Sequence, residues 1–463
     1  MSDVHVVILA AGKGTRMKSA LPKVLHRVAG APLIDYVLAS ANRLSPRTTT
    51  VVIGHQADAM RATLSGHPGL TFVVQEPQLG TAHALLAAEP ALIGHSGTLV
   101  LLSGDVPLLS AKTLETLVGT HREARAATTV LTAMVDHPTG YGRIVRSGEQ
   151  IARIVEEKDA SASERAIREI NTGIYALDLR GLFDAVRGIG SENAQKEYYL
   201  PDLVSTYRTQ GRTVATAAVL DPAEVQGVNS REDLAMVTRA LRHAKNGDLM
   251  AAGVTLEDPA TTYVDPDVQI GADTILHPGV SVEKGSTIGK SCEIHSGARI
   301  VASHLGDHVT ILNHCLITDC EIAEHVSVGP FAHLRNGTAL AARSKIGNFV
   351  EVKKSTVGQG SKAMHLAYLG DTVLGRHVNI GAGTITCNYD GVKKHQTTIE
   401  DGAFIGSDTQ LIAPVTVGEG AYVGTGTTVR ENVPAGALAV SAGKQRNIDG
   451  WVLARKKRSD NDK

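Results

Sequence analysis

A glycine-rich turn near the N-terminus carries residues suited to binding phosphate. The apolar stretch VVILA runs directly into Ala11, Gly12, Lys13, Gly14, Thr15 and Arg16. Glycines let backbone N–H groups approach phosphate oxygens, and ligands of α/β sheets bind at the carboxyl ends of the strands. The turn is neither a Walker A loop nor a complete GxGxxG motif. The alternative is a tight turn that binds no ligand.

Asp105 is a second residue whose position suggests chemistry. It directly follows a strongly apolar run in the segment LLSGDVPLL. A carboxylate at the end of a buried strand can bind a divalent cation through its oxygens. The alternative is an Asp that forms a turn ahead of Pro107.

His365 is a candidate general base. A histidine has a pKa near neutral, so it can act as a general base. The chain has 19 histidines, and for most of them a surface or structural role is the simpler interpretation. His365 lies in SKAMHLAYLGD, residues 361–371, where a regular repeat is interrupted.

That repeat places an apolar residue at every sixth position over two long stretches. Its members are Val264, Ile270, Leu276, Val282, Ile288, Ile294 and Ile300, and then Ile399, Ile405, Leu411, Val417, Val423 and Val429. A helix has a period of about 3.6 and a strand a period of about 2, so neither produces a period of six. Stacked hexapeptide coils of a β-solenoid do.

Two features accompany the repeat. A glycine directly follows many of its apolar positions, where the backbone needs either a positive φ or a close approach between coils. Residues 361–371 and CNYDGVKKHQT, residues 387–397, break the count. Insertions in a solenoid project from one face and commonly carry the binding residues, so we expect both segments to project.

The N-terminal half has a different pattern, in which apolar strands alternate with Ala- and Leu-rich helical stretches. This alternation predicts an open, mostly parallel α/β sheet. Ser230 and Asp233 form a capping-box pattern at the start of a helix. We therefore predict an N-terminal domain at 1–231, a helical linker at 232–252 and a solenoid domain at 253–463.

Composition excludes several classes of protein. The 463 residues carry a formal net charge of −1, which argues against a nucleic-acid coat or a membrane-surface protein. Cys292, Cys315, Cys320 and Cys387 form no CxxC pair, and no apolar stretch is long enough to span a membrane. We expect reduced thiols, a cytoplasmic location, and a solvated basic tail at Arg455, Lys456, Lys457 and Arg458.

The segment LAAGKGTRM followed by LPKVL resembles the signature of sugar-1-phosphate nucleotidylyltransferases. The resemblance implies a Rossmann-like α/β domain in which Arg16 and Lys23 neutralise phosphate charge. It further implies UTP and sugar-nucleotide contacts at Leu9, Ala10, Ala11, Gly12, Gln75, Gly80, Thr81, Ser103, Gly104, Gly142, Glu156 and Asn171. Asp105 and Asn229 would hold Mg²⁺, and Asn229 would also contact the nucleotide.

Nearly the whole chain resembles one family of bifunctional bacterial enzymes, the N-acetylglucosamine-1-phosphate uridylyltransferases that are also glucosamine-1-phosphate acetyltransferases. The resemblance implies a left-handed parallel β-helix, a homotrimer, and His365 as the base of acetyl transfer. The sugar phosphate would bind Arg335, Lys353, Tyr368, Asn379 and Asn388. Acetyl-CoA would contact Ala382, Asn388, Tyr389, Ser407 and Thr425, with Lys394 near its phosphates.

The sequence departs from a well-known pattern of this family at two positions. Thr425 stands where that pattern has Ala, and Ala442, with Lys444 nearby, stands where it has Arg. The predicted function is acetyl transfer from acetyl-CoA to glucosamine-1-phosphate, followed by uridylyl transfer from UTP to N-acetylglucosamine-1-phosphate. Two alternatives keep the repeat inert, either as a trimerisation module of a single enzyme or as part of a scaffold.

Overall fold

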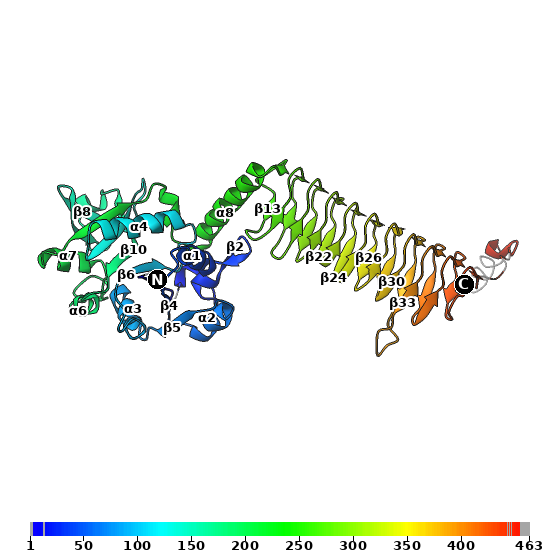
Figure 1. The fold of residues 1–463 in the computed structure, drawn as a ribbon, viewed down its shortest axis with the longest axis horizontal. Coiled ribbons are helices and arrows are strands. Elements are labelled where there is room, and N and C mark those ends of the chain that lie inside the picture. The colour runs from blue at the N-terminus through cyan, green and yellow to red at the C-terminus, as the bar shows by residue number, and fades with distance from the viewer. Residues whose placement is uncertain (1–2, 13, 442, 444, 446, 454–463) are drawn as a thin grey trace. The chain divides into compact units, whose positions relative to one another are not determined.

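The chain folds into two compact units, Met1–Leu241 and Arg242–Lys463, which are described separately below (Figure 1). The computed structural model describes residues 3–12, 14–441, 443, 445 and 447–453. Lys13, Ala442, Lys444 and the basic tail at 455–458 lie outside the described residues. Within the described residues, no helix has both the length and the apolar character needed to cross a membrane.

The first unit is built on a nine-stranded sheet whose main path runs β11-β7-β10-β6-β1-β4-β5. Its strands are β1 (Val4–Leu9), β4 (Thr48–Ile53), β5 (Leu70–Val74), β6 (Thr98–Ser103), β7 (Thr128–Met134), β8 (Gly142–Ser147), β9 (Gln150–Val155), β10 (Glu169–Asp178) and β11 (Val214–Ala218). The pairings along the path are parallel except those of β10 with β6 and β7. The predicted open, mostly parallel sheet is confirmed.

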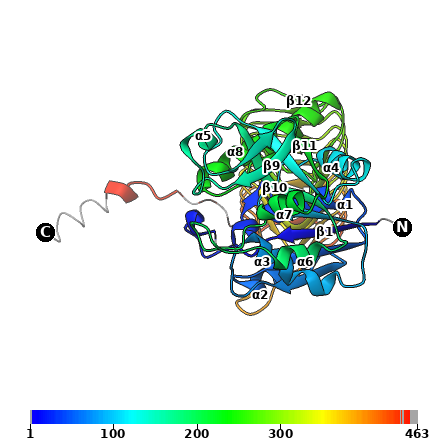
Figure 2. The ribbon, with the colours of Figure 1, turned by 90° about the vertical axis from the view of Figure 1, so that its left-hand side faces the viewer.

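Helices cover both faces of this sheet. Figure 2 shows the first unit from the side on which α7 lies. Residues of α1 (Leu33–Asn42), α2 (Ala57–Leu64) and α4 (Ala111–Glu123) share one apolar core with the sheet. Residues of α3 (Thr81–Ala87), α6 (Leu182–Arg187) and α7 (Asp202–Thr209) share the other. Shorter elements are α5 (Ala162–Arg165), η1 (Thr15–Met17), η2 (Lys23–Leu25), η3 (Glu89–Ala91), η4 (Pro222–Val225), β2 (Arg27–Val28) and β3 (Ala31–Pro32).

The central strand β1 shows why the sheet must be covered on both faces. Val6 and Ile8 belong to one core and Val7 belongs to the other, and all three are fully buried. Such continuous apolar strands are typical of parallel sheets that lie between helical layers. The carboxyl ends of β1 and β6 lie side by side, because Leu9 pairs with Ser103. The chain therefore leaves both strands at the same edge of the sheet.

Helix α8 (Arg231–Ala251) begins at the predicted cap. The Asp233 carboxylate accepts hydrogen bonds from the backbone N–H groups of Asn229 and Ser230, both at 2.9 Å, and the Ser230 hydroxyl accepts one from the Asp233 N–H. These bonds satisfy N–H groups that the first turn leaves without intrahelical partners. They also fix the backbone at Asn229, one of the predicted metal ligands.

The second unit is a β-solenoid with three strands in each coil (Figure 1). Leu276 pairs in parallel with Ile294, and Ile300 pairs with Ile317, so a coil spans 18 or 17 residues. One face comprises β12 (Thr255–Leu256), β15 (Ile275–Leu276), β18 (Glu293–Ile294), β21 (Thr310–Ile311), β23 (Ser327–Val328), β25 (Lys345–Asn348), β28 (Lys362–His365), β31 (Asn379–Ile380), β34 (Phe404–Ile405), β37 (Tyr422–Val423) and β39 (Leu438–Ala439).

The other two faces form a continuous 17-stranded sheet. Its strands are β13 (Tyr263–Val264), β14 (Gln269–Ile270), β16 (Ser281–Val282), β17 (Thr287–Ile288), β19 (Arg299–Val301), β20 (His304–Leu305), β22 (Leu316–Ile322), β24 (His333–Leu340), β26 (Glu351–Lys353), β27 (Thr356–Val357), β29 (Tyr368–Gly370), β30 (Thr372–Leu374), β32 (Ile385–Cys387), β33 (Thr397–Ile399), β35 (Gln410–Ile412), β36 (Val415–Val417) and β38 (Thr428–Val429). These stacked parallel coils are consistent with the predicted left-handed β-helix.

All thirteen apolar positions of the predicted repeat are buried in one continuous core. Glycines that follow these and other inward apolar residues allow close approach between coils. A Cβ added at Gly381 would lie 2.5 Å from the backbone nitrogen of Ser407 in the next coil, and one at Gly406 would lie 2.6 Å from that of Thr425. Neither glycine has a positive φ, so close approach is the reason for glycine at both positions.

One of the two expected projections is wrong. Residues 361–371 form an ordinary coil, in which Ala363 pairs with Ile346 and Leu369 pairs with Val352. Ala363 occupies the inward position that a branched residue holds elsewhere, so the pattern looked interrupted while the coil continued. The segment between β32 and β33 does project, as the prediction requires (Figure 1). Ile385 pairs with Gln410, so this coil spans 25 residues.

The four cysteines are free thiols, as predicted. Burial raises the pKa of the Cys292, Cys315 and Cys320 thiols, most strongly at Cys320, where it reaches about 12. A thiol with a raised pKa is a poor nucleophile. These three residues therefore act as small core residues of the solenoid.

Two candidate active sites

The first site is centred on Lys23, which joins both predicted metal ligands. Its ammonium group forms an ion pair with the Asp105 carboxylate and donates a hydrogen bond to the Asn229 amide oxygen at 3.1 Å. Lys23 belongs to η2, Asp105 follows β6, and Asn229 precedes α8, so three distant segments converge here. The Asp105 carbonyl also accepts a hydrogen bond from the Val228 N–H at 2.9 Å, which holds the Asn229 segment in place.

The donor set at this point fits a hard divalent cation. Asp105 and Asn229 both direct side-chain oxygens at one positively charged atom, the Lys23 nitrogen. Carboxylate and amide oxygens are the ligands that Mg²⁺ prefers. The lysine ammonium marks the position toward which the two oxygens converge. It also supplies a second positive charge beside any metal that binds there.

A cavity of about 440 Å³ next to the glycine-rich turn collects most of the predicted nucleotide contacts. Its lining includes Leu9, Ala11, Gly12, Gln75, Gly80 and Thr81. Gln75 is buried and donates a hydrogen bond to the Gly80 carbonyl at 3.0 Å. Gly80 has a φ of 112°, and a Cβ there would lie 2.6 Å from the Tyr198 carbonyl oxygen. Only glycine fits this turn, which holds the lining in place.

A second cavity of about 190 Å³ collects the predicted sugar contacts and shares Leu9 and Thr81 with the first. Ser103, Gly142, Glu156 and Asn171 line it. Burial raises the pKa of the Glu156 carboxyl, and Asp159 and Asp202 raise it further. The buried hydroxyl of Tyr175 donates a hydrogen bond to the Asn171 amide oxygen at 2.9 Å. The cavity therefore presents oriented polar groups against an apolar wall.

Besides Lys23 and Asn229, three predicted contacts lie outside the described lining of both cavities. Ala10 is buried beside Gly104, whose N–H donates to the Leu9 carbonyl at 2.9 Å. A Cβ added at Gly104 would lie 3.4 Å from the Ala10 Cβ and 3.2 Å from the Leu9 carbonyl oxygen. Arg16 is exposed on η1. The first two residues shape the junction of β1 with β6, and Arg16 extends from the adjacent turn.

The second site contains His365, which is exposed at the end of β28. Its Nδ1 lies 2.8 Å from the amide oxygen of Asn348, the residue paired with it on β25. An amide oxygen accepts hydrogen bonds, so His365 donates through an Nδ1–H. This contact leaves Nε2 with its lone pair. A histidine held in this way is prepared to accept a proton.

Three residues predicted to contact acetyl-CoA lie on the coils that follow His365, at the same position of each coil. The register aligns Ala363 with Ile380, Ile380 with Ile405 and Ile405 with Val423. Two positions after each of these four aligned residues, the chain has His365, Ala382, Ser407 and Thr425. All four are exposed. Four successive coils therefore present one column of residues on the same edge of the solenoid.

Arg335, Lys353 and Lys394 form a cluster of cations. Arg335 on β24 pairs in register with Lys353 on β26. Lys394 from the projecting loop, and then Arg335, lower the pKa of the Lys353 ammonium. Glu351 balances part of this charge, because its carboxylate accepts hydrogen bonds from the Arg335 guanidinium at 2.6 and 2.9 Å. The remaining positive charge favours an anion such as a phosphate.

Tyr368 and Asn388 meet over the backbone of Gly370. A Cβ at Gly370 would collide with the Tyr368 hydroxyl and would lie 2.8 Å from the Asn388 amide nitrogen. Asn388 is buried and donates to the Asp371 carboxylate at 2.6 Å. Gly370 lies in the same register as Lys353, so these two residues adjoin the cation cluster.

The remaining predicted residues lie on the projecting loop and on β31. The Tyr389 hydroxyl donates to the Gly391 carbonyl at 2.6 Å, and Tyr389 is exposed. Backbone N–H groups of the loop and the His395 ring lower the pKa of the Asp390 carboxyl to about 2. These contacts, all within the loop, hold it in a turn. Asn379 lies on β31, in register with Lys362 and Phe404.

Models of three known families match parts of the chain. Residues 6–171 match the MobA-like NTP transferase domain. Residues 259–348 match the GMPPB C-terminal domain, and residues 396–431 match six repeats of the bacterial transferase hexapeptide. The first match spans the glycine-rich turn and much of both cavities. The second and third fall in the solenoid.

Curated relatives match over nearly the full length. The bifunctional protein GlmU of Pelobacter propionicus is 50% identical over 99% of this chain and 100% of its own. That of Trichlorobacter lovleyi is 49% identical over 98% of this chain and 99% of its own. This chain belongs to the GlmU family. GlmU proteins join a uridylyltransferase and a glucosamine-1-phosphate acetyltransferase, so the predicted family, fold class and pair of activities are confirmed.

Membership of the GlmU family gives no support to the two alternatives in which the repeat is only a trimerisation module or part of a scaffold. The structure also places near both sites residues that the motifs did not indicate. Tyr141 lines the smaller cavity of the first unit, and burial raises the pKa of its hydroxyl. Asn348 and Glu351 contact His365 and Arg335 respectively, each from the preceding or following coil. In the sequence, the signal for Asn348 and Glu351 is their separation from their partners by 17 and 16 residues, which is about one coil. This signal can be used only when the register of the coils is known.

Proposed function

We propose that the first unit performs uridylyl transfer at the two joined cavities, with UTP in the larger and N-acetylglucosamine-1-phosphate in the smaller. An oxygen of the sugar phosphate attacks the α-phosphorus of UTP, the bond from that phosphorus to the bridging oxygen breaks, and pyrophosphate leaves. Lys23 and Arg16 offset the repulsion between the two anions. Asp105 and Asn229 would hold Mg²⁺, which would supply further positive charge beside the phosphate of the uridylyl group that is transferred.

The remaining residues of this site bind and orient the substrates. Gln75, held by the Gly80 carbonyl, would face the base, and Thr81 lines both cavities. Glu156 and Asn171 line the smaller cavity and would accept hydrogen bonds from the sugar hydroxyls. Orientation of two reactants in fixed cavities supplies a large part of catalysis in phosphoryl transfer.

In the second unit, we assign His365 as the general base of acetyl transfer. The amine of glucosamine-1-phosphate loses a proton to Nε2 of His365 and attacks the thioester carbon of acetyl-CoA. The carbon–sulfur bond then breaks, and the thiolate of CoA takes a proton as it leaves. Asn348 holds the ring in the tautomer that this step needs.

The sugar phosphate is assigned to Arg335 and Lys353, with Tyr368, Asn379 and Asn388 around the sugar. Acetyl-CoA is assigned to the column of Ala382, Ser407 and Thr425, together with Asn388 and Tyr389. Lys394 is assigned to the phosphates of the coenzyme. The observation that carries this assignment is the cation cluster, which lies beside Tyr368 and Asn388 in the register of the solenoid.

We further propose that the protein works as a homotrimer in the cytoplasm, with the domain limits 1–231, 232–252 and 253–463. The match to hexapeptide repeats supports the homotrimer. The near-neutral net charge and the free, mostly buried thiols support the cytoplasmic location.

Assays of the two half-reactions on the purified full chain test this assignment. We expect UTP-dependent release of pyrophosphate with N-acetylglucosamine-1-phosphate, and release of free CoA thiol with glucosamine-1-phosphate and acetyl-CoA. Asp105→Ala should abolish the first reaction and spare the second. Unchanged pyrophosphate release by Asp105→Ala would remove Asp105 from the metal site.

A further inference from the structure

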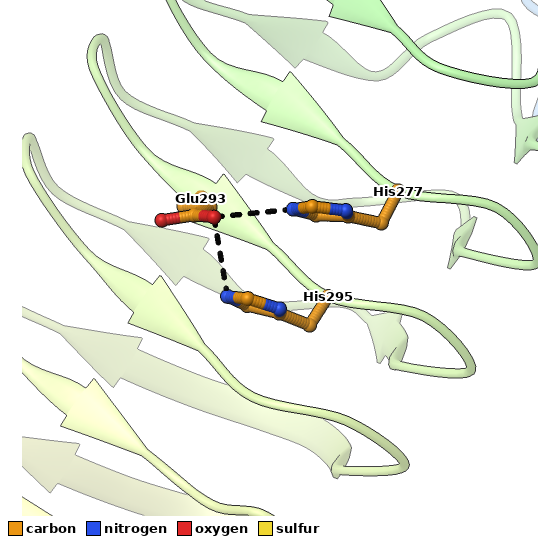
Figure 3. A group of neighbouring side chains, drawn as sticks. All are labelled: His277, Glu293 and His295. Atoms are coloured by element: carbon orange, nitrogen blue, oxygen red, sulfur yellow. Dashed lines mark hydrogen bonds and ion pairs between the residues drawn. The ribbon is translucent and has the colours of Figure 1, made fainter.

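Two groups of charged side chains contain no residue assigned to either reaction. Figure 3 shows His277, Glu293 and His295 of the first group, on the solenoid. His277 lies between the Glu257 and Glu293 carboxylates, at 3.0 and 3.2 Å, and its ring stacks on that of His295 at 4.5 Å. Stacked rings do not direct their lone pairs at one ion, and an imidazolium at His277 would donate to both carboxylates. This group is an ion-pair network that needs no ligand.

The second group is centred on Arg143 in the first unit. Arg143 is only 1% exposed, and its guanidinium donates to the Glu157 carboxylate at 2.6 Å, to the Tyr141 carbonyl, and to the Arg165 carbonyl at 3.4 Å. Its Nε is buried without a hydrogen-bond partner among the described residues. Desolvation cancels much of the attraction in a buried ion pair. Stability alone therefore explains an arginine at this position poorly.

The partners of Arg143 belong to two segments that line the smaller cavity. Gly140 and Tyr141 line it from the segment before β8, and Glu156 lines it from the segment after β9. Glu157 directly follows Glu156, and its carboxylate also accepts a hydrogen bond from the Gly140 N–H at 3.4 Å. Arg143 does not line the cavity itself. Its guanidinium joins the two segments from behind the lining.

The strand pairing shows how closely these segments meet. At Arg143, β8 pairs with both β9 and β10, and the next residue toward the cavity, Gly142, pairs with Asn171. A Cβ added at Gly142 would lie 3.0 Å from a carboxylate oxygen of Glu156. A small shift of the segment before β8 would therefore move several of the residues assigned to the sugar.

Arg143 also acts on Glu156 through its charge. Burial raises the pKa of the Glu156 carboxyl, and Asp159, Asp202 and Glu197 raise it as well, whereas Arg143 lowers it. Loss of the positive charge at Arg143 should therefore raise the pKa of Glu156 further.

We propose that Arg143 is a positioning residue of uridylyl transfer, which holds the Tyr141 and Glu156 segments at the separation that the sugar phosphate requires. The proposal rests on the assignment of N-acetylglucosamine-1-phosphate to the smaller cavity. A guanidinium serves several acceptors in a fixed, planar geometry, whereas a lysine ammonium is a point charge on a flexible chain. The position therefore requires an arginine and not merely a positive charge.

Steady-state kinetics of the purified full chain test the proposal with Arg143→Lys and Arg143→Met. At saturating UTP, we expect both variants to lower kcat/KM for N-acetylglucosamine-1-phosphate by about 10- to 100-fold, mainly through a higher KM. The KM for UTP should stay at the wild-type value, because neither segment lines the larger cavity. Acetyl transfer should not change.

The pH profile of the KM for the sugar phosphate separates position from charge. In Arg143→Met, the rise of this KM on acidification should begin at a higher pH than in the wild type, because the pKa of Glu156 is raised further. Arg143→Lys keeps the charge, so its KM should be higher at every pH while the rise begins nearer to the wild-type pH. A variant that is merely less stable would lower kcat with the folded fraction and leave both KM and its pH profile unchanged.

Two further variants complete the test. Glu157→Gln alters a side chain that is 29% exposed, so it should fold even if Arg143→Met does not. Its effect on KM should not add to that of Arg143→Lys in the double variant, because the two residues act as one unit. Arg146→Met is the matched control, since Arg146 pairs with Glu169 at 2.6 Å from the same strand and neither residue lines the cavity. It should keep the wild-type KM.

A wild-type KM for the sugar phosphate in Arg143→Lys would overturn the proposal, as would fully additive effects of Arg143→Lys and Glu157→Gln. Absence of uridylyl transfer in the wild type would instead contradict the proposed function itself, so the two failures are distinguishable.

Discussion

Glu156 faces the smaller cavity with a carboxyl whose pKa is raised by burial and then by Asp159 and Asp202. Its charged form is the stronger acceptor for a sugar hydroxyl. As pH falls toward the raised pKa, the carboxyl becomes protonated and this acceptor weakens. We therefore expect the KM for N-acetylglucosamine-1-phosphate to rise on acidification within a pH range above the ordinary carboxyl pKa.

Uridylyl transfer measured as a function of pH checks this expectation. Glu156→Gln, which keeps the shape but cannot titrate, should show a higher KM with a flatter pH dependence. The same raised pKa means that protonation of Glu156 favours the folded state, so its stabilising effect disappears as pH rises through that pKa. A KM profile that Glu156→Gln leaves unchanged would remove Glu156 from the sugar site.

Single residues were predictable where a local motif contains them and not where only the fold joins them. Arg335 and Lys353 each stand in a recognisable segment, and the register places them side by side. Asn348 and Glu351 act through partners that lie 16 or 17 residues away in the sequence. That separation carries meaning only once the length of each coil is known.

At the scale of elements, the close approach of glycines between coils makes a direct prediction. Gly381→Ala would place a Cβ against the Ser407 backbone, so the backbone of one of the two coils would have to shift. We expect a loss of about 1–3 kcal/mol in the free energy of unfolding of the second unit. Acetyl transfer should also fall, because Ala382 and Ser407 are neighbours of the collision.

Urea unfolding followed by circular dichroism measures this loss. Gly247→Ala is the control, because Gly247 lies in α8 with open space around the added Cβ and should be neutral or stabilised by up to about 1 kcal/mol. Equal stability of Gly381→Ala and the wild type would contradict the role assigned to the glycines.

The projecting loop allows a second prediction at this scale. Replacing 389–394 by two glycines keeps Asn388 and His395, whose backbones are already hydrogen-bonded at 2.8 Å. The inward residues Thr386 and Thr397 are buried on either side and remain in place. We expect the solenoid to stay folded while acetyl transfer falls sharply, because Tyr389 and Lys394 are lost.

Thiol release and circular dichroism, measured on the same sample, separate these two effects. Full acetyl transfer by the loop variant would contradict the assignment of Tyr389 and Lys394 to acetyl-CoA. Uridylyl transfer serves as the internal control and should not change, since both cavities of that site are built within the first unit.

The repeat predicted the solenoid core correctly because branched residues at every sixth position leave little choice of structure. It failed at 361–371, where Ala363 fills an inward position with a small side chain. Counting only branched residues made this coil look like an insertion. Pairing of Ala363 with Ile346 and Ile380 shows the ladder running through without interruption.

At the scale of the whole molecule, the two units have separate apolar cores, because among the described residues the solenoid core shares none with the cores of the α/β unit. Each ligand should therefore stabilise only the unit that binds it. At 100 times its Kd, a ligand adds about 2.7 kcal/mol to the stability of its unit.

Differential scanning calorimetry tests this expectation. UTP with Mg²⁺ should raise one unfolding transition, and acetyl-CoA should raise the other. A single transition that both ligands shift equally would show that the two units unfold together and would contradict this independence.

The separation of the two reactions is the central claim, and His365→Ala in the full chain tests it most directly. General-base catalysis contributes about 10²- to 10⁴-fold to a rate. We predict that acetyl transfer to glucosamine-1-phosphate falls by that factor while uridylyl transfer to N-acetylglucosamine-1-phosphate stays at the wild-type rate. Acetyl transfer that persists at the wild-type rate, or a loss of both reactions in a folded protein, would contradict the account.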